Sequence, residues 1–381
     1  MSSAPSSPPS APQILWAVYL SIGSGHRIAA EALAATFRRF FAAQYAVYDL
    51  RALDPFSDNL SFLPPVLEYL NLWSRQIFPA LYDAFWRNGI PPGLYKRMLE
   101  LRLLRKIMAS ALEEQQPAAI IATHALPCAL AVEVAPHIPV YGVVTDFGAH
   151  PFWPHRGVSA YFVAHEEIRN TFIYRGFPAE RVFATGIPLR PDFMEIRQPS
   201  STTHDEPLRV LVLAGGQGLG GYRPLERQIL ALIRQVLQMP SLEITVTVVT
   251  GRNEGLRQRL SEAFSHPSIR ILGFVEHMAQ LLADHHVVLT KPGGLSVAEA
   301  LATGTPLLLL RPGVGQERAN EEFLARHRAA LPAYTPEQAL KQVQHLAANR
   351  ALRSTLQRNA LRLGRPDASR RILETLLSSL R

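Results

Sequence analysis

The sequence places a glycine-rich turn at two points where an apolar run gives way to a helical pattern. The turns are GSGH (23–26) and AGGQGLGG (214–221). Glycines let backbone N–H groups approach a phosphate closely, and a helix N-terminus adds a favourable dipole. The second turn is the better diphosphate cradle because five glycines cluster there. No Gly-Lys-Ser/Thr follows either turn, which excludes a P-loop, and either turn could instead serve only close packing.

A third cluster, TKPGGLSVAEALATGTPLLLLRPGVGQERANE (290–321), carries polar side chains at defined places. The pattern predicts a strand ending at Lys291, a Pro-Gly-Gly turn and then a helix that carries Glu299. That carboxylate could accept hydrogen bonds from both hydroxyls of a ribose, and the amides and carboxylate of 316–320 could bind sugar hydroxyls. Alone, Glu299 could equally be a first-turn acidic residue favoured by the helix dipole.

These turns need strands and helices to hold them, and apolar runs alternate with helical patterns over most of the chain. Strands are predicted at 14–20, 118–124, 139–147, 160–165, 208–216, 243–251, 269–274, 286–291 and 305–311. Such alternation predicts an α/β class with mainly parallel sheets. The polar stretch IRQPSSTTHDEP breaks it and predicts an interdomain linker. We therefore expect a disordered leader (1–12), an N-terminal domain (13–195), the linker (196–207) and a C-terminal domain (208–381) whose last helix packs back on the first domain.

Composition limits the kinds of partner, disulfide and metal site that this chain can have. The 381 residues carry a formal net charge of +8. Hydrophobic residues make up 48% of the chain, so a chain of this length can bury two cores. The single cysteine, Cys128, excludes an intrachain disulfide and a cysteine-based metal site. No apolar run approaches the ~20 residues that span a bilayer. Residues 60–107 combine aromatic and basic side chains, which favours an interfacial helix on anionic lipid or, alternatively, two helices packed on the core. Without a basic-aromatic motif, nucleic-acid binding is not expected.

Taken together, the motifs resemble glycosyltransferase family 28, and within it the monogalactosyldiacylglycerol synthases and processive diacylglycerol glycosyltransferases. The N-terminal half carries GSGHRIAAEAL (23–33), THALPCALAV (123–132) and VYGVVTDFGAHPFWPH (140–155). The C-terminal half carries LVLAGGQGLGG (211–221), VVTGRNEGL (248–256), ILGFVEHM (271–278), KPGGLSVAEALATGTPLLL (291–309) and GQERANEEFL (315–324). The resemblance implies a GT-B fold, in which two facing Rossmann-like domains enclose a cleft. It also implies an inverting, metal-independent transfer of a hexose from a UDP-sugar to a lipid, diacylglycerol in the first instance.

The resemblance also implies roles for individual residues. Gly215, Gly216, Gln217 and Gly218 would approach the diphosphate, and Gly251, Arg252, Asn253, Phe274 and Val275 would line the uracil side. Gly293, Gly294, Leu295 and Ser296 would form a donor-binding turn, Glu299 would hold the ribose, and Gln316, Glu317 and Asn320 would hold the sugar. His26 and Asp146 would lie at the catalytic centre, with Gly25, His150 and His155 on the acceptor side. No cofactor and no metal site are implied.

An inverting transfer needs a base for the acceptor hydroxyl and stabilisation of charge on the departing UDP. His26 is our candidate base because histidine titrates near neutrality, and Asp146 competes with it. With no DxD-type cluster visible, helix dipoles and backbone amides, assisted by Arg252, are the candidate charge stabilisers. A polyprenyl-linked or other small acceptor, or a UDP-sugar-binding protein without turnover, remains an alternative. The expected partners are a UDP-sugar, a lipid acceptor and an anionic membrane surface, and the expected location is the cytoplasm, peripherally on the inner face of the cell membrane.

Overall fold

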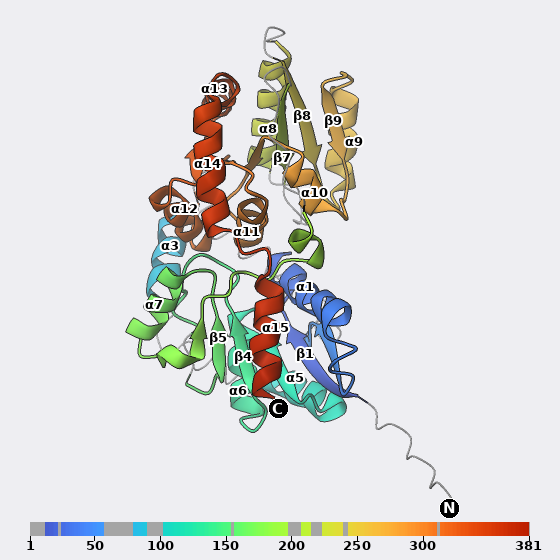
Figure 1. Cartoon of the computed structure of the whole chain (residues 1–381), viewed down its shortest axis with the longest axis vertical. Helices are drawn as coiled ribbons and strands as arrows, with labels where there is room; N and C mark the ends of the chain where they lie inside the picture. Colours follow the sequence, from blue (N-terminus) through green and yellow to red (C-terminus); the bar gives the residue numbers. More distant parts are fainter. Residues whose placement is uncertain are drawn as a thin grey trace, which may run out of the picture.

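The computed structural model describes residues 12–21, 24–56, 79–89, 102–153, 156–196, 207–214, 223–238, 243–310 and 313–380. Within these residues the chain forms two six-stranded sheets in which every recorded pair is parallel. The sheets lie in two α/β domains, one above the other in Figure 1. The predicted α/β class with two parallel sheets is confirmed.

The first sheet has the order β2-β1-β3-β4-β5-β6. Its strands are β1 (Gln13–Val18), β2 (Tyr48–Leu53), β3 (Ala119–Ala122), β4 (Val140–Val143), β5 (Ala160–Phe162) and β6 (Val182–Phe183). The helices of this half are α1 (Gly25–Phe40), α3 (Pro79–Asn88), α5 (Arg102–Gln115), α6 (Ala125–Val134) and α7 (Glu166–Tyr174), with short 3-10 turns η1 (Ala179–Arg181) and η2 (Pro191–Met194). The strands read as continuous apolar runs because both faces of the sheet are buried. One face packs against α5, α6 and α7, and the other against α1.

The second sheet has the order β12-β11-β10-β7-β8-β9. Its strands are β7 (Leu208–Leu213), β8 (Ile244–Val249), β9 (Ile269–Leu272), β10 (Val287–Thr290), β11 (Leu307–Leu309) and β12 (Ala330–Pro332). The helices are α8 (Arg223–Leu237), α9 (Glu254–Ala263), α10 (Met278–Ala283), α11 (Gly294–Thr303), α12 (Gln316–Arg326), α13 (Pro336–Ala348), α14 (Arg350–Leu363) and α15 (Ala368–Ser379). Helices α10, α11 and α12 cover one face, and α8, α9 and α13 cover the other.

The last helix, α15, belongs by packing to the first domain, where Figure 1 shows it beside β4. Its side chains Ile372, Leu373, Leu376 and Leu377 are fully buried against the N-terminal sheet. Burying four such side chains contributes roughly 6–12 kcal/mol before chain entropy is counted. The chain thus crosses between the domains twice. The first crossing lies between β6 and β7, and the second lies between α14 and α15. The crossings touch at Gly186, where φ is +101° and an added Cβ would lie 2.5 Å from Arg365 Cβ.

Each predicted strand corresponds to a strand of one of the two sheets, usually a shorter one, and the strands β2, β6 and β12 were not predicted. Most of the predicted leader (1–12) and linker (196–207) lies outside the described residues. So do 57–78 and 90–101, which hold most of the aromatic and basic segment 60–107. Among the helices that are described, none has the length and apolar character needed to cross a bilayer.

Candidate functional site

His26 lies in the first turn of α1, just beyond β1, and its ring is held by two contacts. Its Nδ1 is 2.7 Å from the carbonyl oxygen of Thr123 and 3.0 Å from Oγ1 of Thr145. A carbonyl oxygen only accepts hydrogen bonds, so Nδ1 carries the proton and Nε2 keeps its lone pair. These contacts come from the ends of the neighbouring strands β3 and β4, and they fix both the tautomer and the ring orientation. Nε2 is therefore the atom of His26 that can accept a proton.

Two further histidines belong to this region, His124 beside His26 and His150 near His124. The His124 ring meets that of His26 edge to face at 4.7 Å between centroids, and His124 caps α6 by accepting a hydrogen bond from Leu126 N. Burial, with the neighbouring His26 and His150, holds the pKa of His124 well below its usual value. Burial and the charge of Arg175 lower the pKa of His150 to about 4. His124 was missed in the sequence, although its place directly after a buried strand matches that of the other site residues.

Asp146 follows β4 and shares the site with His26. Burial raises the pKa of Asp146, while the hydrogen bond from Asn320 and the nearby His26 oppose that rise. Burial lowers the pKa of His26, and the charge of Asp146 opposes that shift. At neutral pH His26 is thus an uncharged imidazole, and an anionic Asp146 would stabilise the imidazolium formed when Nε2 takes a proton.

The C-terminal domain closes over this pair through α11 and α12. The Asn320 side chain is fully buried: its Nδ2 donates to Asp146 Oδ1 and to Pro292 O, each at 2.9 Å, and its Oδ1 accepts from Phe147 N at 2.6 Å. At the first residue of α11, a Cβ on Gly294 would lie 2.0 Å from Thr145 O. Glycine therefore lets the positive N-terminus of α11 approach Thr145 and Asp146 directly.

Glu299 lies farther along α11 and is only 9% exposed. Burial raises the pKa of Glu299 to about 7. Two residues of the first crossing between the domains have smaller, opposite effects: the charge of Arg190 lowers this pKa and that of Asp192 raises it.

Glu317, at the start of α12, is buried and pairs with Lys291 at 2.8 Å. Gln316, Leu295 and Ser296 are half-buried on the first turns of α12 and α11. Gly293 is the N-cap residue of α11 and has no side chain to cap the helix, whose first N–H groups have no partner within the helix.

The residues expected at the uracil side form a separate group at the carboxyl ends of β8 and β9. The guanidinium of Arg252 lies 5.2 Å from the centre of the Phe274 ring, which is 57% exposed. Asn253 caps α9 by accepting a hydrogen bond from Leu256 N at 3.0 Å. Gly251 adopts φ +60°, which glycine tolerates best, and Val275 packs partly against the core. An exposed ring beside a cation offers a surface for a planar base.

The structure therefore brings Asp146, Gly294 and Asn320 into contact from both domains, and His26 joins them through its contact with Thr145. Among the described residues, no atom lies within 4 Å of the place a Cβ on Gly25 would take, and the ring centroids of His150 and Trp86 are 5.4 Å apart. The predicted residues Gly215, Gly216, Gln217, Gly218 and His155 lie outside the described residues.

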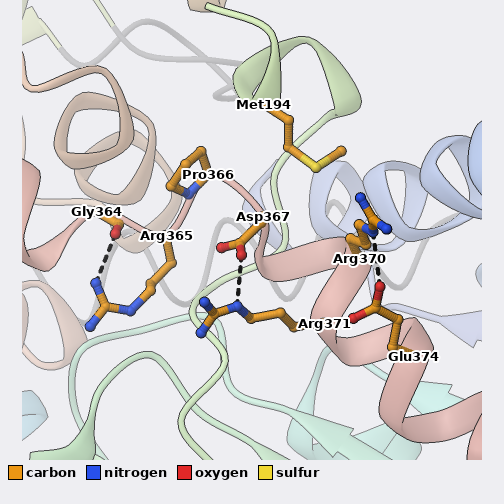
Figure 2. A pocket seen from close by; sticks show the side chains of 8 residues that line it. All are labelled: Met194, Gly364, Arg365, Pro366, Asp367, Arg370, Arg371 and Glu374. Atoms are coloured by element: carbon orange, nitrogen blue, oxygen red, sulfur yellow. Dashed lines mark hydrogen bonds and ion pairs between the residues drawn. The ribbon is translucent and has the colours of Figure 1, made fainter.

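A cavity of about 740 Å³ lies elsewhere, at the second crossing between the domains, and Figure 2 shows the side chains that line it. They are Met194, Gly364, Arg365, Pro366, Asp367, Arg370, Arg371 and Glu374. Two of its arginines form ion pairs, Arg370 with Glu374 at 2.8 Å and Arg371 with Asp367 at 2.7 Å. None of the predicted site residues lines this cavity.

Comparisons with known proteins agree with this geometry. Residues 26–189 match the family model for monogalactosyldiacylglycerol (MGDG) synthase, and residues 209–372 match the glycosyltransferase family 28 C-terminal domain. A processive diacylglycerol beta-glucosyltransferase of Bacillus cereus (strain B4264) is 31% identical over 320 residues, which cover 81% of this chain and 79% of that protein.

Two solved structures share the fold at low identity. MurG of Acinetobacter baumannii gives a TM-score of 0.58 at 17% identity, covering 96% of this chain and all of that one. The UDP-GlcNAc 2-epimerase of Neisseria meningitidis, bound to UDP-GlcNAc, gives 0.61 at 15% identity, again over 96% of this chain and all of that one. Since a transferase and an epimerase both share this GT-B architecture, the fold alone does not decide the reaction. Together, the family matches and the B. cereus relative show that this chain belongs to glycosyltransferase family 28, in the group of the monogalactosyldiacylglycerol synthases and processive diacylglycerol glycosyltransferases.

Proposed function

We propose that this protein is an inverting, metal-independent glycosyltransferase that moves a hexose from a UDP-sugar to diacylglycerol. The observation that carries the proposal is the orientation of His26, whose Nδ1–H is tied to Thr123 O while Nε2 is left to accept a proton beside Asp146. The name of the B. cereus relative makes glucose the first sugar to test and suggests that a second transfer onto the first product be looked for.

In the proposed reaction, Nε2 of His26 removes the proton from the acceptor hydroxyl as its oxygen attacks the anomeric carbon. Attack comes from the face opposite UDP, so the new C–O bond inverts the configuration. The bond from the anomeric carbon to the diphosphate breaks, and its electron pair leaves with UDP. The N-terminus of α11 stabilises that negative charge, helped by the amides of the glycine turn at 215–218 and by Arg252. Asp146 stabilises the imidazolium until its proton is lost.

For the donor, we assign the ribose hydroxyls to Glu299, the uracil to the surface at Arg252 and Phe274, and the sugar to Gln316 and Glu317. Asn320 is the third predicted sugar residue. Its amide is already used between Asp146, Phe147 and Pro292, so a sugar contact would require exchanging one of these bonds. A close-fitting domain interface of this kind suits a cleft that opens to admit the donor and closes for transfer.

For the acceptor, we propose peripheral contact with anionic lipid at the inner face of the cell membrane. The first turns of α5 expose Arg102, Lys106 and the side chain of Leu103, which is 55% exposed. Cations beside an exposed aliphatic side chain suit the boundary between lipid headgroups and acyl chains.

The test is to incubate the protein with phosphatidylglycerol vesicles containing diacylglycerol and, separately, UDP-glucose, UDP-galactose or UDP-glucuronate, without added metal and with EDTA. We expect one donor to give a glycosyl-diacylglycerol of inverted configuration, identified by mass spectrometry and NMR. A product on a polyprenyl phosphate but none on diacylglycerol would establish the alternative acceptor. Donor binding without transfer to any acceptor would establish a binding protein.

A further inference from the structure

His165, Glu167 and His327 form a cluster between the two domains, away from the cleft residues. One ligand atom of each lies within 4.8 Å of the other two. His165 is the N-cap residue of α7 and Glu167 lies in the first turn of that helix, whereas His327 ends α12 in the C-terminal domain. Figure 1 shows α7 and α12 on the same side of the molecule. We propose that this cluster binds one divalent transition-metal ion of the zinc class and thereby links the two domains.

The chemistry of the three side chains selects this class of ion. Imidazole nitrogen and carboxylate oxygen bind Zn²⁺ at about 2.0–2.2 Å, so ligand atoms around a tetrahedral ion lie roughly 3.3 Å apart. Small side-chain rotations bring three atoms already within 4.8 Å to that spacing. Two histidines among three ligands disfavour Ca²⁺ and Mg²⁺, which prefer oxygen. Water would complete the fourth position because all three side chains are only half-buried.

The present contacts show how the cluster would receive an ion. His327 Nε2 and Glu167 Oε1 are 2.5 Å apart, within hydrogen-bond distance, and the other carboxylate oxygen accepts a hydrogen bond from Arg326 at 2.9 Å. An ion would replace this hydrogen bond and bind both the nitrogen and the oxygen. Arg326 would keep the carboxylate oriented, as outer hydrogen bonds do at many metal sites. His165 now accepts a 3.3 Å hydrogen bond from Glu167 N, a weak contact that ligation can replace.

The cluster is joined to the cleft by two stacked aromatic rings. Phe323 of α12 contacts the His165 and His327 rings, at 5.0 and 4.5 Å between centroids, and it stacks on Phe147 at 4.6 Å. Phe147 directly follows Asp146 and donates its N–H to Asn320. An ion here would take no part in sugar transfer, but it would stabilise the contact between α7 and the end of α12.

The experiment titrates Co²⁺ and Zn²⁺ into the full chain, purified without a histidine tag. We expect one Co²⁺ per chain with the visible absorption of a four-coordinate site, and its displacement by Zn²⁺. His165→Asn, which preserves a helix-capping side chain, and His327→Gln should each weaken binding by about tenfold or more. His345→Gln removes an exposed imidazole of α13 and should leave binding unchanged.

A second readout tests the link between domains. Zn²⁺ should raise the Tm of the wild type, and either His165→Asn or His327→Gln should abolish the rise, because each substitution removes a ligand that one of the two domains supplies. Absence of saturable Co²⁺ binding would overturn the proposal, as would wild-type affinity in either variant. Donor turnover measured in EDTA tests the proposed function separately, so failure of one proposal leaves the other intact.

Discussion

Glu299→Gln should stabilise the free protein while weakening its binding of the donor. The pKa of Glu299 rises from 4.5 to about 7 because the carboxyl is buried in α11. Each pKa step is worth about 1.4 kcal/mol, so folding penalises the ionised form by about 3 kcal/mol. Glutamine has nearly the same shape and carries no charge, so it removes this penalty.

The size of this stabilisation depends on pH. Below pH 4.5 Glu299 is neutral in both the folded and unfolded chain, and the variant should match the wild type. Between pH 4.5 and about 7 only the unfolded chain is ionised, so the wild type loses stability as pH rises. Above pH 7 the full difference of about 3 kcal/mol should remain. In a domain of this size it raises the calorimetric Tm by roughly 6–12 °C.

Donor binding should change in the opposite direction. Ribose hydroxyls donate to the carboxylate, and hydrogen bonds to a charged group contribute about 1.5–3 kcal/mol, so Glu299→Gln should raise the Kd roughly 10- to 150-fold at pH 8. In the wild type, affinity should fall up to about tenfold per pH step below 7, and the variant should lack this dependence. UDP-glucose is the calorimetric probe because its diphosphate is esterified at both ends. A variant with wild-type Kd, or with lower Tm at pH 8, would refute the assignment.

Three other substitutions test the cleft. His26→Ala should lower kcat by about 10²–10⁴-fold with an unchanged Kd for the donor, and near-normal turnover would remove His26 as the base. Gly294→Ala puts a Cβ 2.0 Å from Thr145 O and should lower kcat/KM by about 100-fold, and wild-type kcat/KM would contradict the close approach of α11. Asn320→Ala leaves buried groups of both domains without their partner and should cost about 2–4 kcal/mol in urea unfolding; a loss below about 0.5 kcal/mol would contradict the interdomain role.

Much of the fold could be predicted because buried parallel strands are apolar on both faces and stand out in the sequence. The missed strands lack that signal for identifiable reasons. β2 reads YDLRAL and lies at a sheet edge, so its polar side chains face solvent. β6 has two residues, and β12 ends at Pro332, also on an edge strand. Strands were predicted too long where polar site residues follow them, as with Asp146 after β4.

The motifs identified where His26 and Asp146 lie along the chain, since both follow strands. They could not give the tautomer of His26, which depends on Thr123 and Thr145 from two other loops. Nor could they show that Asn320 joins the two domains, because that depends on how α12 packs against the loop that follows β4. The raised pKa of Glu299 likewise follows from burial by segments distant in sequence.

Helix α15 follows the C-terminal domain in sequence but packs on the N-terminal domain, so a single cut in the chain cannot separate two intact domains. A fragment ending near residue 195 would lack four buried side chains of its own core, and a fragment beginning near 208 would carry them exposed. A better-designed acceptor half joins residues 366–381 to the N-terminal domain through a short linker, leaving a donor half that ends near Gly364. Between intact halves, two covalent connections restrict relative motion more than a single linker would, and this favours return of the donor half to the same position relative to His26.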